Sequence, residues 1–145
     1  MSQDNRAAEA IGVADLEDYF TRYGWVADRI DETSIQTGLS EGNLVLPVVV
    51  QIDDGYIYFR MFLFPNAALD QETDYLRLMR INDSAPVLKL SVGSANELVA
   101  GIEYLVDLMD YDLFETTLNM LSGFIGAFYE DIAAAVSLVE VDGAE

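Results

Sequence analysis

The chain has 145 residues, 52% of them hydrophobic, and its 26 acidic against seven basic residues give a formal net charge of −19. It has no histidine and no cysteine, so imidazole catalysis, thiolate nucleophiles, zinc sites and disulfides lack their usual residues. The negative charge repels phosphate backbones and anionic membranes, which argues against nucleic-acid and membrane partners.

The hydrophobic content and length predict one folded domain rather than a disordered chain. We expect this domain to cover residues 13–138, with a flexible tail or frayed helix over 1–12 and a polar tail over 139–145. The first six residues lack a basic stretch followed by an apolar core, so we expect no signal peptide. The absence of cysteine suits a reducing compartment, and we expect a cytoplasmic location.

Hydrophobic periodicity predicts a first helix over 13–23, because its apolar residues recur every three or four positions. Gly24 follows it as a C′ residue that is free to adopt a positive φ. Apolar and β-branched residues then predict three strands, over 34–40, 44–52 and 56–64. The second of these contains Pro47, which lacks an amide donor and indicates an edge or a bulge there.

The second predicted helix runs from Asp70 to about residue 81, with acids at its start and arginines at its end. Its expected apolar stripe consists of Leu69, Leu76 and Met79. We expect Asn82 to hydrogen-bond the chain as it leaves this helix.

Two more strands, over 87–92 and 97–104, precede a long amphipathic helix whose apolar stripe extends from Phe114 to Val136. Asp112 is its expected N-cap, with Glu115 completing a capping box. Gly123 and Gly126 would each cost roughly 1 kcal/mol relative to alanine, so we expect another element to approach the helix closely there. The order α-βββ-α-ββ-α, with short links, predicts an α+β fold with an antiparallel sheet of about five strands.

This order resembles the type III secretion chaperone-like fold, and more closely its YbjN-type branch, over roughly residues 15–132. The resemblance rests on four stretches: Leu16-Glu-Asp-Tyr-Phe with Gly24-Trp25, Asp53-Asp54-Gly55, Leu78-Met-Arg-Ile-Asn82, and the closing amphipathic helix. It implies a small α+β domain that is often dimeric. Secretion-chaperone members bind unfolded segments of effector proteins, and YbjN-type members are described only as regulators or chaperone-like proteins.

Alternation along the strands indicates one purely apolar sheet face, which the helices should cover, and a second amphipathic face. Contiguous apolar patches of that kind usually mark contacts with other molecules. The protein-binding candidates on this second face are Val45, Val49, Tyr56, Tyr58, Arg60, Phe62 and Lys89. The alternative is an ordinary second sheet face that tails and loops of the same chain cover.

Two acidic groups have both a functional and a structural interpretation. Asp107, Asp110, Asp112 and Glu115 offer oxygens for calcium, but they lack the glycine and ligand spacing of an EF-hand, and acids at a helix start are the favoured reading. Asp28, Asp31 and Glu32 could attract a basic partner, although a solvated turn is favoured. We therefore expect no metal, no cofactor and no catalytic residue.

The composition also has two readings at the level of the whole chain. Aspartate outnumbers glutamate by 15 to 11, and Lys89 is the only lysine. Such a balance either keeps the protein monodisperse by self-repulsion or reflects a high-salt cytoplasm, where a Debye length of ~3 Å or less suppresses that repulsion.

We expect a non-catalytic, chaperone-like or regulatory domain that binds another polypeptide and forms a homodimer, through its second helix or an exposed strand. The alternative is a small-molecule sensor or a carboxylate-based enzyme, which would need a pocket with convergent polar groups between sheet and helices.

Overall fold

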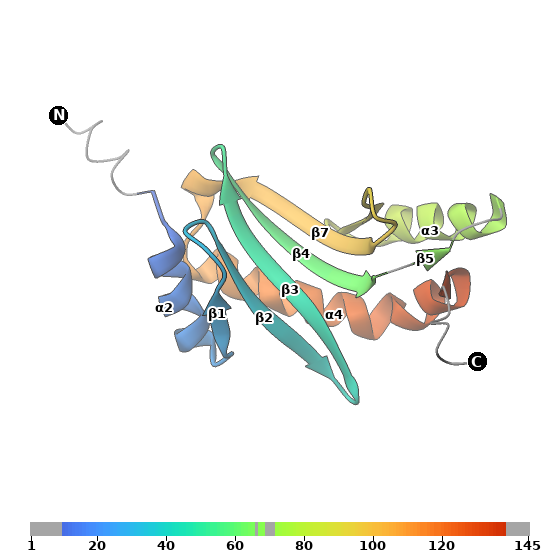
Figure 1. Ribbon diagram of the computed structural model, residues 1–145, viewed down its shortest axis with the longest axis horizontal. Coiled ribbons are helices and arrows are strands. Elements are labelled where there is room, and N and C mark those ends of the chain that lie inside the picture. The colour runs from blue at the N-terminus through green and yellow to red at the C-terminus, as the bar shows by residue number, and fades with distance from the viewer. Residues whose placement is uncertain (1–9, 66, 69–71, 139–145) are drawn as a thin grey trace.

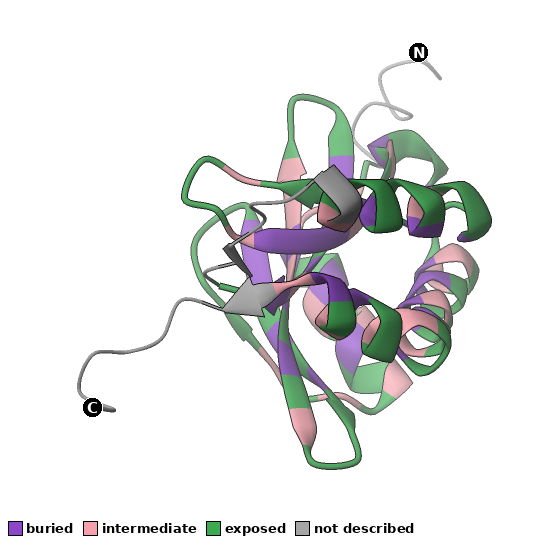
Figure 2. Ribbon diagram, turned by 90° about the vertical axis from the view of Figure 1, so that its right-hand side faces the viewer, coloured by how far each residue is buried: buried purple, intermediate pink, exposed green. Residues whose placement is uncertain are grey.

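The computed structural model describes residues 10–65, 67–68 and 72–138, which form an α+β fold (Figure 1). Six antiparallel strands make one sheet in the order β1-β2-β3-β4-β7-β6, and β5 pairs with β8 beside it. The helices lie on one side of the sheet (Figure 2). The elements are α2 Val13–Tyr23, β1 Ala27–Arg29, β2 Ser34–Glu41, β3 Leu44–Asp53, β4 Tyr56–Phe64, β5 Ala67–Ala68, α3 Glu72–Ser84, β6 Lys89–Val92, β7 Leu98–Leu105, a 3-10 turn Val106–Leu108, α4 Tyr111–Ala135 and β8 Ser137–Leu138.

The core lies between the helices and the covered sheet face. Its largest fully buried side chains include Leu16 and Phe20 from α2, Phe59 from β4, and Phe114 and Leu118 from α4. The Phe114 ring packs edge-on against Phe20, with 4.8 Å between ring centres. Burying each such side chain contributes about 1.5–3 kcal/mol, so this layer holds α2 and α4 on the sheet.

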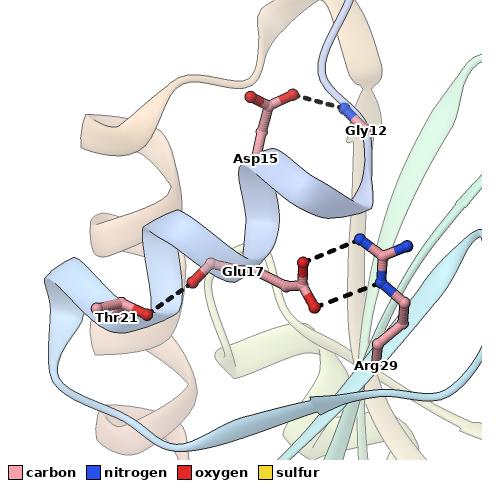
Figure 3. Close-up of polar contacts among 5 residues, drawn as sticks. All are labelled: Gly12, Asp15, Glu17, Thr21 and Arg29. Atoms are coloured by element: carbon pink, nitrogen blue, oxygen red, sulfur yellow. Dashed lines mark hydrogen bonds and ion pairs between the residues drawn. The ribbon is translucent and has the colours of Figure 1, made fainter.

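The first helix has the predicted bounds, and Gly24 ends it in the left-handed region with a φ of 99°. At its start the Gly12 amide donates to the Asp15 carboxylate at 2.8 Å. Figure 3 shows Glu17 on this helix paired with Arg29 on β1, at 2.9 Å. Because both side chains are about two-fifths exposed, solvent screens this ion pair, and the buried apolar side chains hold α2 in place.

The three central strands form within one residue of their predicted bounds, while β1, β5 and β8 were not predicted. These strands have only two or three residues each, too few for an alternation pattern. Pro47 lies on an interior strand, yet β3 pairs with β4 only from Val48 onward. At the proline, β3 pairs with β2 alone, which is how the chain tolerates the missing donor.

A bulge changes the direction of one aromatic side chain at the end of β4. The β4–β7 register shifts between Phe62 and Phe64. Strict alternation would place Phe64 on the amphipathic face with Phe62. Instead Phe64 is buried and stacks on Tyr129 of α4, with ring centres 5.6 Å apart. Sequence alternation alone misplaces this ring, because the extra residue of a bulge inverts the pattern after it.

The second helix buries a different stripe from the one predicted. Leu78 and Ile81 face the core, as does Ala85 just after the helix, whereas Leu76 and Met79 are 48% and 64% exposed. Both stripes have helical spacing, so periodicity alone could not select between them. Leu69 and the predicted start at Asp70 lie outside the described residues.

The strand after α3 begins two residues later than predicted, because Val87 has a φ of 70° and cannot continue a strand. Asn82 makes the expected bonds to the chain beyond the helix. Its Oδ1 accepts from the Leu90 amide at 2.6 Å, and its Nδ2 donates to the Leu90 carbonyl at 3.2 Å. Its side chain therefore satisfies backbone groups on the outer edge of β6.

Two expectations about the last helix are wrong. Asp110, not Asp112, is the N-cap, because its carboxylate accepts from the Leu113 amide at 2.9 Å. Among the described residues no other element approaches Gly123 or Gly126: both are exposed, and a Cβ built on either would meet no described atom within 4 Å.

Candidate functional site: the open face of the sheet

One face of the six-stranded sheet is not covered by any described helix, and we call it the open face (Figures 1 and 2). The strand register defines its rows. One row crosses all six strands through Asp28, Gln36, Val49, Arg60, Gly101 and Lys89. Three of the predicted protein-binding candidates therefore share a single row, in which Val49 and Arg60 are neighbours and Gly101 separates Arg60 from Lys89.

All seven candidates alternate onto this face. Val45, Tyr56, Arg60 and Lys89 are exposed, and Val49, Tyr58 and Phe62 are half-buried. Exposed aromatic and β-branched side chains in adjacent strands form the kind of contiguous apolar surface that contacts other molecules.

Four of the candidates line one hollow of about 460 Å³ over β4, β7 and β6, which we call the β4–β7–β6 hollow. Tyr58 and Phe62 supply its apolar side chains, while Arg60 and Lys89 supply cations. Residues outside the predicted binding candidates complete it: Phe59, Ser91, Gly93, Glu97, Val99, Gly101, Ile102 and Glu103. The hollow is open to solvent on the sheet surface and does not lie between sheet and helices.

The hollow exists because β7 has a glycine at its centre. A Cβ at Gly101 would lie 3.1 Å from the Phe59 carbonyl oxygen and 3.8 Å from Cγ of Arg60. A larger residue would therefore push against the backbone of β4 and fill the floor. A glycine inside a predicted strand marks close backbone approach or missing side-chain volume, so the sequence did contain a signal for this position.

Lys89 lines the hollow, but its ammonium group bonds to carbonyl oxygens at the end of α3. Its Nζ donates to the carbonyl oxygens of Asn82 and Ala85, at 2.6 and 2.9 Å. These carbonyls belong to the C-terminal end of α3, where the helix dipole favours a cation. The ammonium group therefore fixes α3 to the edge strand.

Arg60 also lines the hollow, and its guanidinium lies near an aromatic ring of the same lining. Its Cζ lies 5.1 Å from the centre of the Tyr58 ring, which is within the range of a cation–π contact. Glu103 is opposite Tyr58 and thus diagonal to Arg60. Even so, within the described ranges the only ion pair joins Arg29 and Glu17, so Arg60 pairs with no carboxylate there.

Val45 lines a second hollow of about 510 Å³, over β1, β2 and β3. Val26 and Ile30, which are 85% and 50% exposed, flank β1 and also line it. Neither residue is predictable from the sequence, because both adjoin a strand of only three residues. Val49 and Tyr56 lie on the open face outside both hollows.

Two carboxylates near these hollows, those of Glu97 and Asp31, have hydrogen-bond partners within the fold. Glu97 accepts from the Ala95 amide at 3.0 Å and so folds into the β6–β7 turn. Asp31 accepts from the Thr33 amide and the Ser34 hydroxyl, at 2.9 and 2.7 Å, and these bonds lower its pKa from the ordinary value. Of the predicted acidic turn, Asp28 instead belongs to β1. Among residues 10–65, 67–68 and 72–138, no three acids gather closely enough to hold a metal ion.

Comparison with known proteins finds a solved structure with a similar fold. The chain superimposes on the SpcU chain of the heterodimeric ExoU–SpcU complex from the type III secretion system of Pseudomonas aeruginosa, with a TM-score of 0.60. The match covers 84% of this chain and 98% of the other. The fold is that of a secretion chaperone. The predicted α+β class and secretion chaperone-like architecture are thereby confirmed.

The likeness to SpcU is one of structure, because only 18% of the aligned residues are identical. No protein-family model and no curated protein matches the sequence, so the YbjN-type branch has no support from these comparisons. None of the helices in the described part of the chain has the length and apolar character needed to cross a bilayer.

Proposed function

We propose that this protein is a non-catalytic, chaperone-like domain that binds another polypeptide on its open face. The observation that supports this most is the open face itself, where Tyr58, Phe62 and Val45 line two hollows that no described helix covers. The ExoU–SpcU complex adds support, because a chain of the same fold there is bound to a second protein. No specific observation favours the alternative of a sensor or an enzyme.

Native pull-down with open-face variants tests this proposal. The variants Tyr58→Asp and Val45→Asp add a charge to each hollow, and Thr116→Asp adds the same charge to the exposed side of α4 as a matched control. We expect wild type and the control to recover the same defined protein, and the open-face variants to lose it. Equal recovery by all, or recovery of a small molecule in place of a protein, would contradict the proposal.

We further propose a homodimer that forms through α3. The predicted alternative, an exposed strand, is disfavoured: Asn82 occupies the backbone groups of Leu90 on edge strand β6, and edge strand β1 has only three residues. On α3, by contrast, Tyr75, Leu76 and Met79 are about half or more exposed. Sedimentation should give a dimer that Met79→Glu converts to a monomer. A wild-type monomer of 16.1 kDa at every concentration would refute this.

The YbjN-type branch and a high-salt cytoplasm are finer parts of the same proposal. The branch is supported by the stretch Leu78-Met-Arg-Ile-Asn82 near the end of α3, whose asparagine joins α3 to β6. The high-salt setting is supported by the acidic composition, and a salt titration of stability tests it.

A further inference from the structure

The charged residues that line the β4–β7–β6 hollow have a formal net charge of zero in a strongly acidic protein. Arg60 and Lys89 balance Glu97 and Glu103 in its lining, whereas the whole chain has a net charge of −19. The local formal charge at this hollow therefore differs from the strongly negative net charge of the chain. Local contacts, more than the overall field, decide what binds in such a place.

Two of the four charged side chains in this lining bond to other described parts of the fold, and two do not. The ammonium of Lys89 bonds to the end of α3, and the carboxylate of Glu97 bonds within its turn. Arg60 and Glu103 form no ion pair within the described ranges.

Arg60 also differs from most of the other described cations. Arg22 lies 3.9 Å from the Tyr111 ring centre, Arg29 pairs with Glu17, and Arg77 donates to the Ala134 carbonyl. Each of these contacts joins two elements of the fold. Arg60 contacts Tyr58, two positions away on its own strand, and so joins no separate elements.

From these contacts, and resting on the proposed function, we propose that Arg60 binds a carboxylate of the bound polypeptide. The occupant is an extended segment in which one acidic side chain lies between apolar side chains. Arginine presents a planar fork that fits a carboxylate with two parallel hydrogen bonds. The missing side chain at Gly101 provides room beside it, and Tyr58 and Phe62, two positions to either side on β4, offer apolar contacts for the flanking residues. A strongly acidic segment is disfavoured, because the net charge would repel it.

The test uses an array of capped synthetic nonapeptides with alternating apolar residues around a central glutamate, each with a glutamine twin. Binding is measured for the full chain at about 0.15 M salt, where the Debye length is about 8 Å. The variants are Arg60→Gln, Arg60→Lys and, as a charge-matched control on α3, Arg80→Gln. Thermal unfolding checks that each variant is folded.

We expect glutamate peptides to bind at least about tenfold more tightly than their glutamine twins, as for a charge-assisted pair. Arg60→Gln should abolish this preference, Arg60→Lys should keep part of it, and Arg80→Gln should leave it unchanged. Peptides that bind without preferring glutamate, or a preference that survives Arg60→Gln, would overturn the role of Arg60 and leave the proposed function standing. If no peptide binds, this inference falls, and the pull-down decides the proposed function separately.

A chain that ends at Leu138 distinguishes the partner from the protein's own carboxylates. Residues 139–145 lie outside the described residues and include Glu140, Asp142 and Glu145. If the glutamate preference is absent in the full chain and arises only in the shortened one, the carboxylate that Arg60 binds is the chain's own. That outcome would overturn a partner as the occupant.

Discussion

Asn82 joins the end of α3 to the edge strand β6 through two hydrogen bonds to Leu90. Both bonds are partly buried, so removing the amide leaves the backbone groups of Leu90 without these partners. At about 1 kcal/mol for each lost bond, Asn82→Ala should lower the free energy of unfolding by about 2 kcal/mol. Urea unfolding measures this.

Asn82→Asp is the matched control, because it keeps the acceptor for the Leu90 amide and loses the donor to the Leu90 carbonyl. Because a carboxylate oxygen then faces the Leu90 carbonyl oxygen, we expect a loss of at least the one bond, about 1 kcal/mol. If the free energy of unfolding of the alanine variant instead lies within about 0.5 kcal/mol of the wild-type value, as for ordinary surface substitutions, the two hydrogen bonds to Leu90 have no role in stability.

For single residues, the sequence predicts the sheet face on which a side chain lies but not its tertiary contacts. Alternation placed Arg60 and Lys89 on one face, and the register confirms that placement. It could not show that the long stem of Lys89 takes its ammonium to the carbonyls of α3. Nor could it place Phe64, whose direction depends on a bulge between two strands. Both outcomes depend on tertiary contacts, which a local pattern does not contain.

At the scale of elements, the two glycines of α4 lower the stability of the helix, and no close contact with the described residues requires them. Gly123 and Gly126 are exposed in the helix, and a Cβ at either position has open space. Gly123→Ala and Gly126→Ala should therefore each raise the free energy of unfolding by up to about 1 kcal/mol. Urea unfolding of each single variant is the measurement.

Gly24→Ala is the control of opposite sign, because Gly24 has a φ of 99°, where a side chain is strained. It should lower stability. Destabilisation by the α4 substitutions would show that something in the folded protein approaches these glycines after all.

Long elements were predictable, and short ones were not. The helix α2 and the strands β2, β3 and β4 each have enough residues to show a period, and their bounds agree with the structure within one residue. The strands β1, β5 and β8 exist only through pairing with distant partners. In α3 two stripes of helical spacing compete, and packing against α4 and β6 decides which one is buried.

At the scale of the whole molecule, charge repulsion should control stability. A net charge of −19 acts on a chain with one ion pair among its described residues, so repulsion is relieved mainly by dissolved salt. We expect the melting temperature to rise strongly from low to molar potassium chloride. A melting temperature that barely moves would mean that the charge serves solubility, and would remove the high-salt proposal without affecting the fold.

The central claim is that a polypeptide binds the open face, and photo-crosslinking tests it most directly. A photoreactive phenylalanine analogue replaces Tyr58 in the β4–β7–β6 hollow, Val45 in the hollow over β1–β3, or Thr116 on the exposed side of α4. Irradiation of each variant in native lysate, followed by mass spectrometry, identifies what lies at each position. We predict the same crosslinked protein from positions 58 and 45 and none from 116. Crosslinks from position 116 alone would show that the partner binds the helical side, and would contradict the account.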